Sequence, residues 1–241
     1  MKINPKIRHQ DLAQHVKKQL EFIPVEDVRS SVIGMVFIGF DLFLLLGLVS
    51  ILKLEFLWIV SLFILIVHLW GIRLVIKNPY STQFEMVLFM GILGLFAAIS
   101  LFIVVQGMSY YTLYITSVFY YIIIDLAAII SIYILVKYQI DKYAGDPTKE
   151  KKGGNQSKYM GVLTIAPAIG YILGQSVQDT IVLKHVISLA VIYFFAIFFV
   201  YVAAKFLHRY FFMRANMDYV NYYPYSNKEK KKLIKQGVEI K

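Results

Sequence analysis

The chain contains no cysteine, which excludes disulfide bonds, thiolate metal ligands and cysteine nucleophiles. Acidic charge is scarce, with 15 Asp and Glu residues against 25 Lys and Arg residues. The sequence also lacks an H-E-x-x-H zinc motif, a G-x-S-x-G nucleophile turn and a G-x-x-x-x-G-K-[ST] phosphate loop. Its five histidines show no metal-ligand spacing. The sequence therefore predicts neither an enzyme nor a metal or cofactor protein.

Apolar residues are abundant instead. They make up 59% of the chain, and the mean hydropathy is +0.63, too high for an ordinary soluble domain. They form six stretches, each near the ~20 residues that cross ~30 Å of hydrocarbon: 31–52, 54–72, 86–106, 110–136, 160–178 and 181–204. We therefore expect an all-α, multi-pass membrane protein with six transmembrane helices. It would have an N-tail at 1–30, a membrane domain at 31–204 with a loop at 137–159, and a basic, aromatic tail at 205–241.

The basic residues give this bundle a direction. All except Lys53 and Lys184 lie in the tails or in alternate connectors, and basic residues near span ends resist translocation. Both termini are therefore expected on the cytoplasmic side. No A-x-A-like cleavage site follows the first stretch, so we expect that span to be retained. The preference for Lys over Arg is typical of AT-rich bacterial genomes, which favours a bacterial cell membrane.

An amphipathic helix is expected before the first span. Leu12, Val16, Leu20 and Ile23 fall on one face of residues 9–23. Asp11 is a suitable N-cap, and Pro24 ends the pattern. Such a helix can lie flat at the membrane interface, or it can pack on the inner surface of the bundle.

Asp41 and Asp125 are the acidic residues deep inside predicted spans. Asp41 lies about 10 residues from the cytoplasmic start of the first span and Asp125 about 11 from the cytoplasmic end of the fourth, so each is ~15 Å deep. A carboxylate there must be protonated, paired or in contact with water. If the two spans are neighbours, the carboxyl groups could share a proton or flank a cation.

Both carboxyl groups also have a purely structural interpretation. Each could be protonated and hydrogen-bonded to a hydroxyl group on a neighbouring helix. Candidate partners follow the third span: Tyr114, Thr116, Ser117, Tyr120 and Tyr121. His68, near the cytoplasmic end of the second span, could relay protons, although a lone histidine among apolar residues also fits simple packing.

The fifth span carries small residues at helical spacing. Ala166, Gly170 and Gly174 recur every four residues, and Pro167 interrupts the backbone hydrogen bonds. This pattern predicts close helix packing, self-association into a homo-oligomer, or a broken helix that binds substrate.

The C-terminal tail combines tyrosines with a basic run that contains Lys228, Lys230, Lys231 and Lys232. Because these charges lie beside membrane spans, we expect anionic lipid headgroups as their partner and no nucleic acid. A protein-docking role for the tail is the alternative.

The layout resembles the permease subunits of ABC-2-type exporters, which have six spans, both ends inside and an amphipathic helix before the first span. The resemblance implies a partner ATPase on the inner connectors. Such permeases often carry an outer helical hairpin between spans five and six, whereas here only a few residues around Asp179 are available. Small bacterial immunity proteins against toxins or bacteriocins are similar in profile. The sequence thus leaves two functions open: a transport-type protein, either a permease subunit or a small ion- or proton-coupled carrier, or a non-catalytic interaction protein with a toxin or assembly partner.

Overall fold

The computed structural model describes residues 2–49, 54–150, 181–220, 231 and 235, and within these residues it forms helices and turns without a strand. Among the described residues, five helical segments are long and apolar enough to cross a membrane: Val25–Leu45, Trp58–Ile76, Gln83–Thr112, Val118–Tyr143 and Val182–Ala215. Helices suit this environment because they satisfy their own backbone hydrogen bonds in hydrocarbon. The prediction of a helical membrane protein is confirmed, while the predicted span 160–178 lies outside the described residues.

The first span is one continuous helix with a wide-turned middle. It comprises α2 (Val25–Ile33), the π-helical segment η2 (Gly34–Leu42) and α3 (Phe43–Val49). It begins six residues before the predicted start at residue 31, since acidic residues in the first turn of α2 interact favourably with the helix N-terminus. The boundary predicted between tail and membrane domain therefore falls inside this helix.

The next two spans are α4 (Leu54–Ile76) and α5 (Gln83–Gly107), joined through the short turn η3 (Pro79–Ser81). Helical structure continues past α5 through η4 (Met108–Thr112), so the connector lies at 113–117 and not at 106–109 as predicted. The polar residues there do not end the helix, because Ser109 Oγ donates to the Val105 carbonyl oxygen at 2.8 Å.

The last two described spans are α6 (Val118–Tyr143) and α8 (Ile181–Ala215). With 35 residues, α8 is about 52 Å long, far more than the ~30 Å of a hydrocarbon core. The helix therefore continues 11 residues past the predicted end of the span at residue 204, and its last turns form a platform at this end of the bundle.

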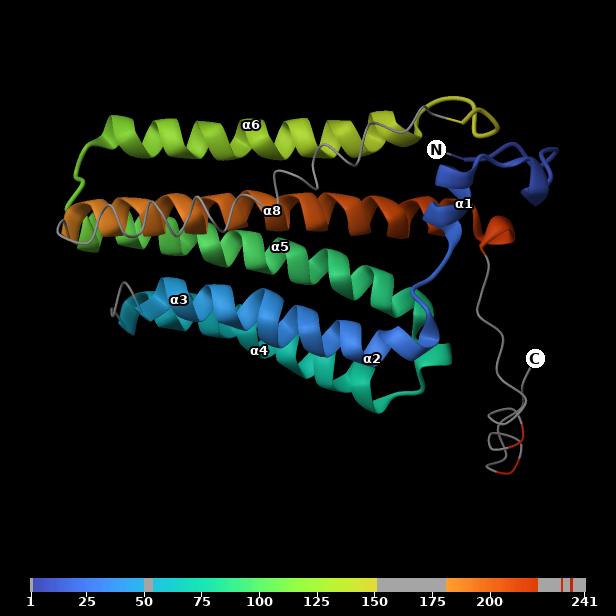
Figure 1. The fold of residues 1–241 in the computed structure, drawn as a ribbon, viewed down its shortest axis with the longest axis horizontal. Helices are drawn as coiled ribbons and strands as arrows, with labels where there is room; N and C mark the ends of the chain where they lie inside the picture. Colours follow the sequence, from blue (N-terminus) through green and yellow to red (C-terminus); the bar gives the residue numbers. More distant parts are fainter. Residues whose placement is uncertain (1, 50–53, 151–180, 221–230, 232–234, 236–241) are drawn as a thin grey trace.

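The helices pack in three groups, with α5 and α8 side by side in the middle (Figure 1). α6 lies against α8, whereas α2, α3 and α4 lie on the α5 side. The main apolar core follows α5, where Leu93, Ala97 and Leu101 are fully buried, together with Ala196 and Phe199 of α8.

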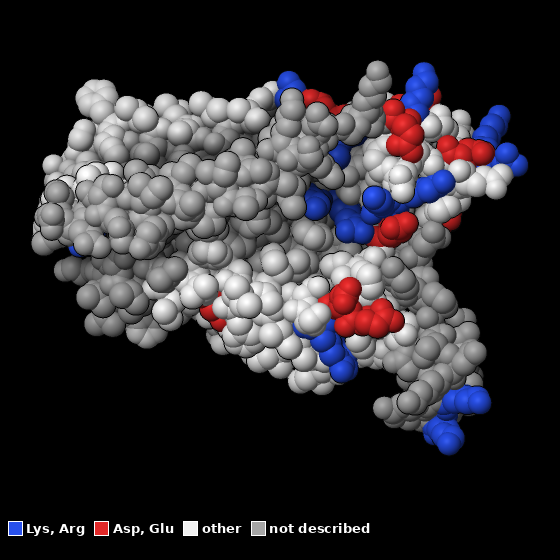
Figure 2. Space-filling model, in the orientation of Figure 1, with Lys and Arg blue, Asp and Glu red and all other residues white. Residues whose placement is uncertain are grey.

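The start of α2 and the ends of α4, α6 and α8 lie at the same end of the bundle (Figure 1). Figure 2 shows that the described charged side chains gather mainly at this end. We refer to residues 2–30, 77–82, 137–150 and 205–220 as the charged end.

Candidate functional site

The structure brings Asp41 and His68 together where η2 meets α4. His68 Nε2 lies 3.0 Å from Asp41 Oδ2, and the two side chains keep 26% and 29% of their surfaces exposed. The ring of Phe37 meets the imidazole edge to face, with ring centroids 5.8 Å apart. Both residues belong to segments apolar enough to span a membrane. A titratable pair is thus held inside the apolar part of the bundle.

The other ring nitrogen of His68 determines how many protons this pair holds. Nδ1 lies 2.8 Å from the Ile64 carbonyl oxygen, which can only accept, so we assign a hydrogen to Nδ1. In a neutral imidazole, Nε2 then carries a lone pair, and an ionised carboxylate has no hydrogen to offer. The 3.0 Å contact therefore requires one further proton, on Oδ2 or on Nε2. With this further proton, which we call the loaded state, the pair has no net charge. Without it, in the unloaded state, the pair has a single negative charge.

The wide turns of η2 position Asp41. In a π-helix each backbone N–H bonds to the carbonyl five residues earlier, so the residues that follow face a different direction than in an uninterrupted α-helix. Asp41 is the second-last residue of this segment. The face on which it emerges meets α4, and this rotation could not be read from a regular helical pattern.

Asp125 has a different kind of partner. Its Oδ1 accepts a hydrogen bond from Gln106 Nε2 at 2.6 Å, between α5 and α6. One oxygen of the carboxylate thus accepts from an amide, and an amide does not titrate. This contact can neutralise part of the desolvation cost of Asp125, but it provides no second site for a proton.

Asp41 and Asp125 are not brought together. Asp41 lies on the side of α5 that faces α4, while Asp125 lies on α6, with α5 and α8 between these groups (Figure 1). Matched depth in two spans therefore does not produce a shared site. Two of the hydroxyl groups expected near Asp125 bond elsewhere: Tyr120 to Ser109 at 2.9 Å, and Tyr121 to the Ile115 carbonyl at 2.7 Å.

Close helix packing occurs at glycines that the sequence analysis missed. A Cβ on Gly94 would lie 2.7 Å from the Ala203 backbone nitrogen, and one on Gly91 would lie 2.8 Å from Leu207 Cδ2. Only glycine permits this approach of α5 to α8. The signal in the sequence is Gly91-x-x-Gly94 followed by Ala97, a spacing of three residues in place of the four of the motif in the fifth span.

The other predicted positions fall where the structure gives little or no description. The motif of Ala166, Pro167, Gly170 and Gly174 lies outside the described residues, as do Lys228, Lys230 and Lys232. Lys231 is described and is exposed.

At the charged end, the N-terminal segment packs on the platform of α8. α1 (Gln14–Leu20) is shorter than the predicted helix 9–23, but the predicted apolar face is confirmed: Leu12, Val16 and Leu20 are buried. They form a second core with Phe212 and Met213 of α8. Of the two arrangements expected for this helix, the structure has the one in which its apolar face contacts protein.

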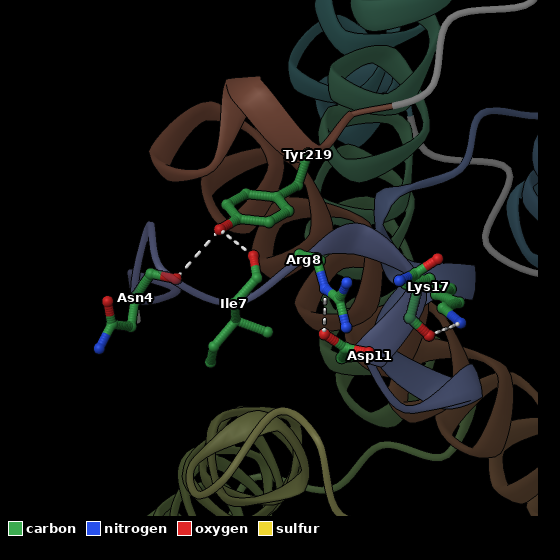
Figure 3. A network of polar contacts seen from close by, with 7 residues as sticks. Asn4, Ile7, Arg8, Asp11, Lys17 and Tyr219 are labelled. Carbon is green, nitrogen blue, oxygen red and sulfur yellow. Dashed lines mark hydrogen bonds and ion pairs between the residues drawn. The ribbon is translucent and has the colours of Figure 1, made fainter.

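Polar contacts hold this segment along its length. Arg209 donates to the carbonyl oxygens of Lys18 and Glu21 at the C-terminal end of α1, and Gln19 Nε2 lies 3.2 Å from His208 Nδ1. Tyr219 donates its hydroxyl hydrogen toward the carbonyl oxygens of Asn4 and Ile7, at 3.0 and 2.8 Å (Figure 3).

The connector after α6 holds the other end of α1. The Ala13 N–H donates to the Pro147 carbonyl at 2.8 Å, and the Gln14 N–H donates to Glu150 Oε1 at 2.6 Å. Glu150 thus satisfies the helix N-terminus, a role predicted for Asp11. Asp11 instead pairs with Arg8 at 3.1 Å (Figure 3).

The same connector contains a self-contained turn at its tip. Thr148 donates from its hydroxyl and backbone N–H to Asp146 Oδ1, at 2.7 and 3.0 Å. These hydrogen bonds lower the pKa of the Asp146 carboxyl group. The turn is therefore kept in its charged, hydrogen-bonded form at neutral pH.

Within the described part of the chain, no group of three or more His, Cys, Asp or Glu side chains is placed to hold a metal ion. The Asp41–His68 contact is thus the chemically distinctive site of the apolar region. Comparison with known proteins finds no family model, no curated protein and no solved structure that matches this chain.

Proposed function

We propose that this chain is a transport-type protein of the cell membrane, in which the Asp41–His68 pair carries a proton. The observation that supports the proposal is the 3.0 Å contact between two titratable groups inside apolar spans. Such groups are rare within membranes, and they often mark ion or proton pathways. A site that is uncharged when loaded and negative when unloaded provides the two states that a proton-coupled carrier needs.

The proposed topology has six crossings with both termini on the cytoplasmic side. The distribution of basic residues places the charged end in the cytoplasm in this proposal. It is supported by the described ends of two helices: α6 ends at the charged end, and α8 begins at the opposite end (Figure 1). In this orientation α1 lies at the level of the cytoplasmic headgroups, with its apolar face against α8 and its polar face toward anionic lipid or a partner protein.

The proton would act on the contact between η2 and α4. When the proton leaves, the carboxylate and the bare Nε2 lone pair face each other, and the contact becomes repulsive. Loss of the proton therefore favours separation of Asp41 from His68, and reloading favours closure. The π-helical turns around Asp41 are the natural place for this movement, since such turns are often found at functional sites.

The proposal can be tested by proton flux into vesicles. The full chain would be reconstituted with a pH-sensitive dye inside, and a membrane potential would drive protons inward. We expect wild-type vesicles to acidify faster than protein-free vesicles, and Asp41→Asn to lose the added rate by about a hundredfold because the proton-accepting group is removed.

Asp125→Asn is the matched control, because it removes the other deep carboxylate while keeping an oxygen that can accept from Gln106. Its flux should stay near that of the wild type. Equal flux in wild-type and protein-free vesicles would count against a proton carrier, and would favour the interaction protein with a toxin or assembly partner.

A further inference from the structure

A lateral groove runs between the first span and α4. Its volume is about 220 Å³. One wall comes from α2 and η2, through Val32, Ile33, Val36 and Phe37, and the other comes from α4, through Gly71, Ile72 and Ile76. The rim is open: Phe37 is 57% exposed and Ile76 is 75% exposed. In a membrane, this opening faces the hydrocarbon of the bilayer.

Gly71 lines the groove and has space around it for a side chain. A Cβ added to Gly71 would make ordinary contacts, 3.4 Å from Val36 and 3.5 Å from Val32. We therefore expect a larger side chain at this position to fill part of the groove.

The two ends of the groove differ in chemistry. His68 lies at the deep end, held by Asp41. Arg29 lies one helical turn beyond the other end, because 29, 32 and 33 follow the i, i+3, i+4 pattern of one face of α2. Arg29 is exposed at the charged end, and no ion pair joins it to another described residue. Glu26, one turn earlier, is also exposed and lies further from the groove.

We propose that this groove binds one acyl chain of an anionic phospholipid, with the phosphate at Arg29. The apolar walls match a hydrocarbon chain, and a guanidinium group binds phosphate through paired hydrogen bonds. Arg29 lies four residues, about 6 Å along α2, before Ile33 of the groove wall, so a chain whose phosphate is at Arg29 extends along the groove toward His68. The site requires the membrane orientation proposed above, but not proton transport.

Native mass spectrometry of the purified full chain tests the site. The protein in detergent would be titrated with phosphatidylglycerol and, separately, with phosphatidylcholine of the same acyl chains. We expect one phosphatidylglycerol molecule to bind tightly and phosphatidylcholine to bind more weakly. Arg29→Gln should weaken the binding of phosphatidylglycerol by about tenfold, to the affinity of phosphatidylcholine, because a charge-assisted contact is lost.

Two further variants locate the lipid. Gly71→Leu should remove the tight binding of phosphatidylglycerol. Ile33→Trp on the rim is the alternative variant if Gly71→Leu does not fold. Arg214→Gln removes another exposed guanidinium at the charged end and should change nothing. Equal binding of both lipids to the wild type, or tight binding that survives Arg29→Gln and the filled groove, would overturn the proposal. This experiment measures lipid binding and not proton flux, so the lipid site can fail while the proposed proton transport holds, and the reverse.

Discussion

The contact between α5 and α8 and the contact between α2–η2 and α4 are built in opposite ways. At α5 and α8, glycines bring backbones so close that a Cβ on Gly94 would lie 2.7 Å from a backbone nitrogen. At η2 and α4, the helices leave a groove of about 220 Å³ and meet through the polar pair Asp41–His68. The α5–α8 contact leaves no space for a change in the distance between the helices, whereas the contact between η2 and α4 does.

This difference separates a fixed part of the bundle from a part that can move. Tightly packed interfaces have one arrangement and resist small displacements. An interface with free volume, wide helical turns and a titratable contact can adopt two arrangements whose balance depends on a proton. We therefore expect the first span and α4 to move relative to a rigid unit of α5 and α8.

The largest expected effect is on the rigid unit. Gly94→Val places two methyl groups against the α8 backbone and should lower the free energy of unfolding by about 3 kcal/mol, the upper part of the range for overpacked cores. Denaturation in detergent, followed by circular dichroism, measures this loss.

Gly34→Ala is the control for glycine removal itself. Its backbone is in the ordinary helical region, with φ −61° and ψ −42°, and a Cβ would meet nothing within 4 Å. Stability should rise slightly or stay unchanged. If Gly94→Val were equally harmless, the α5–α8 contact would not be rigid.

A smaller effect is expected for the polar pair, where a double-mutant cycle isolates the contact. Asp41→Asn and His68→Gln should each cost about 1 kcal/mol, and the double variant should cost less than their sum because both remove the same interaction. Additive costs would mean that the two side chains act independently.

The smallest effect is expected at the groove rim. Ile72 is 53% exposed, so Ile72→Ala should change the free energy of unfolding by less than about 0.5 kcal/mol. The same denaturation experiment applies. A loss as large as that of Gly94→Val would show that the groove walls are as tightly packed as the α5–α8 contact.

Much of this arrangement could be predicted from the pattern of apolar residues, and the parts that could not have physical causes. The five candidate spans of the described residues follow from the length of the apolar stretches, and the buried face of α1 follows from their periodicity. Helix ends do not, since Ser109 and Gln106 satisfy their hydrogen bonds within the bundle and allow the helix to continue. Asp41 and His68 were both recognised as candidates, but their contact depends on the π-helical rotation.

The polar contacts at the charged end join residues that are distant in the sequence. Asn216 accepts from the Ile3 N–H, and Arg209 reaches the carbonyl of Lys18, across 213 and 191 residues. During synthesis, the N-terminal segment emerges long before the helix on which it docks, so Leu12, Val16 and Leu20 remain uncovered until α8 is in place. Docking of this segment is therefore a late step of biogenesis, and a chain that stops before α8 would display this apolar face to chaperones and proteases.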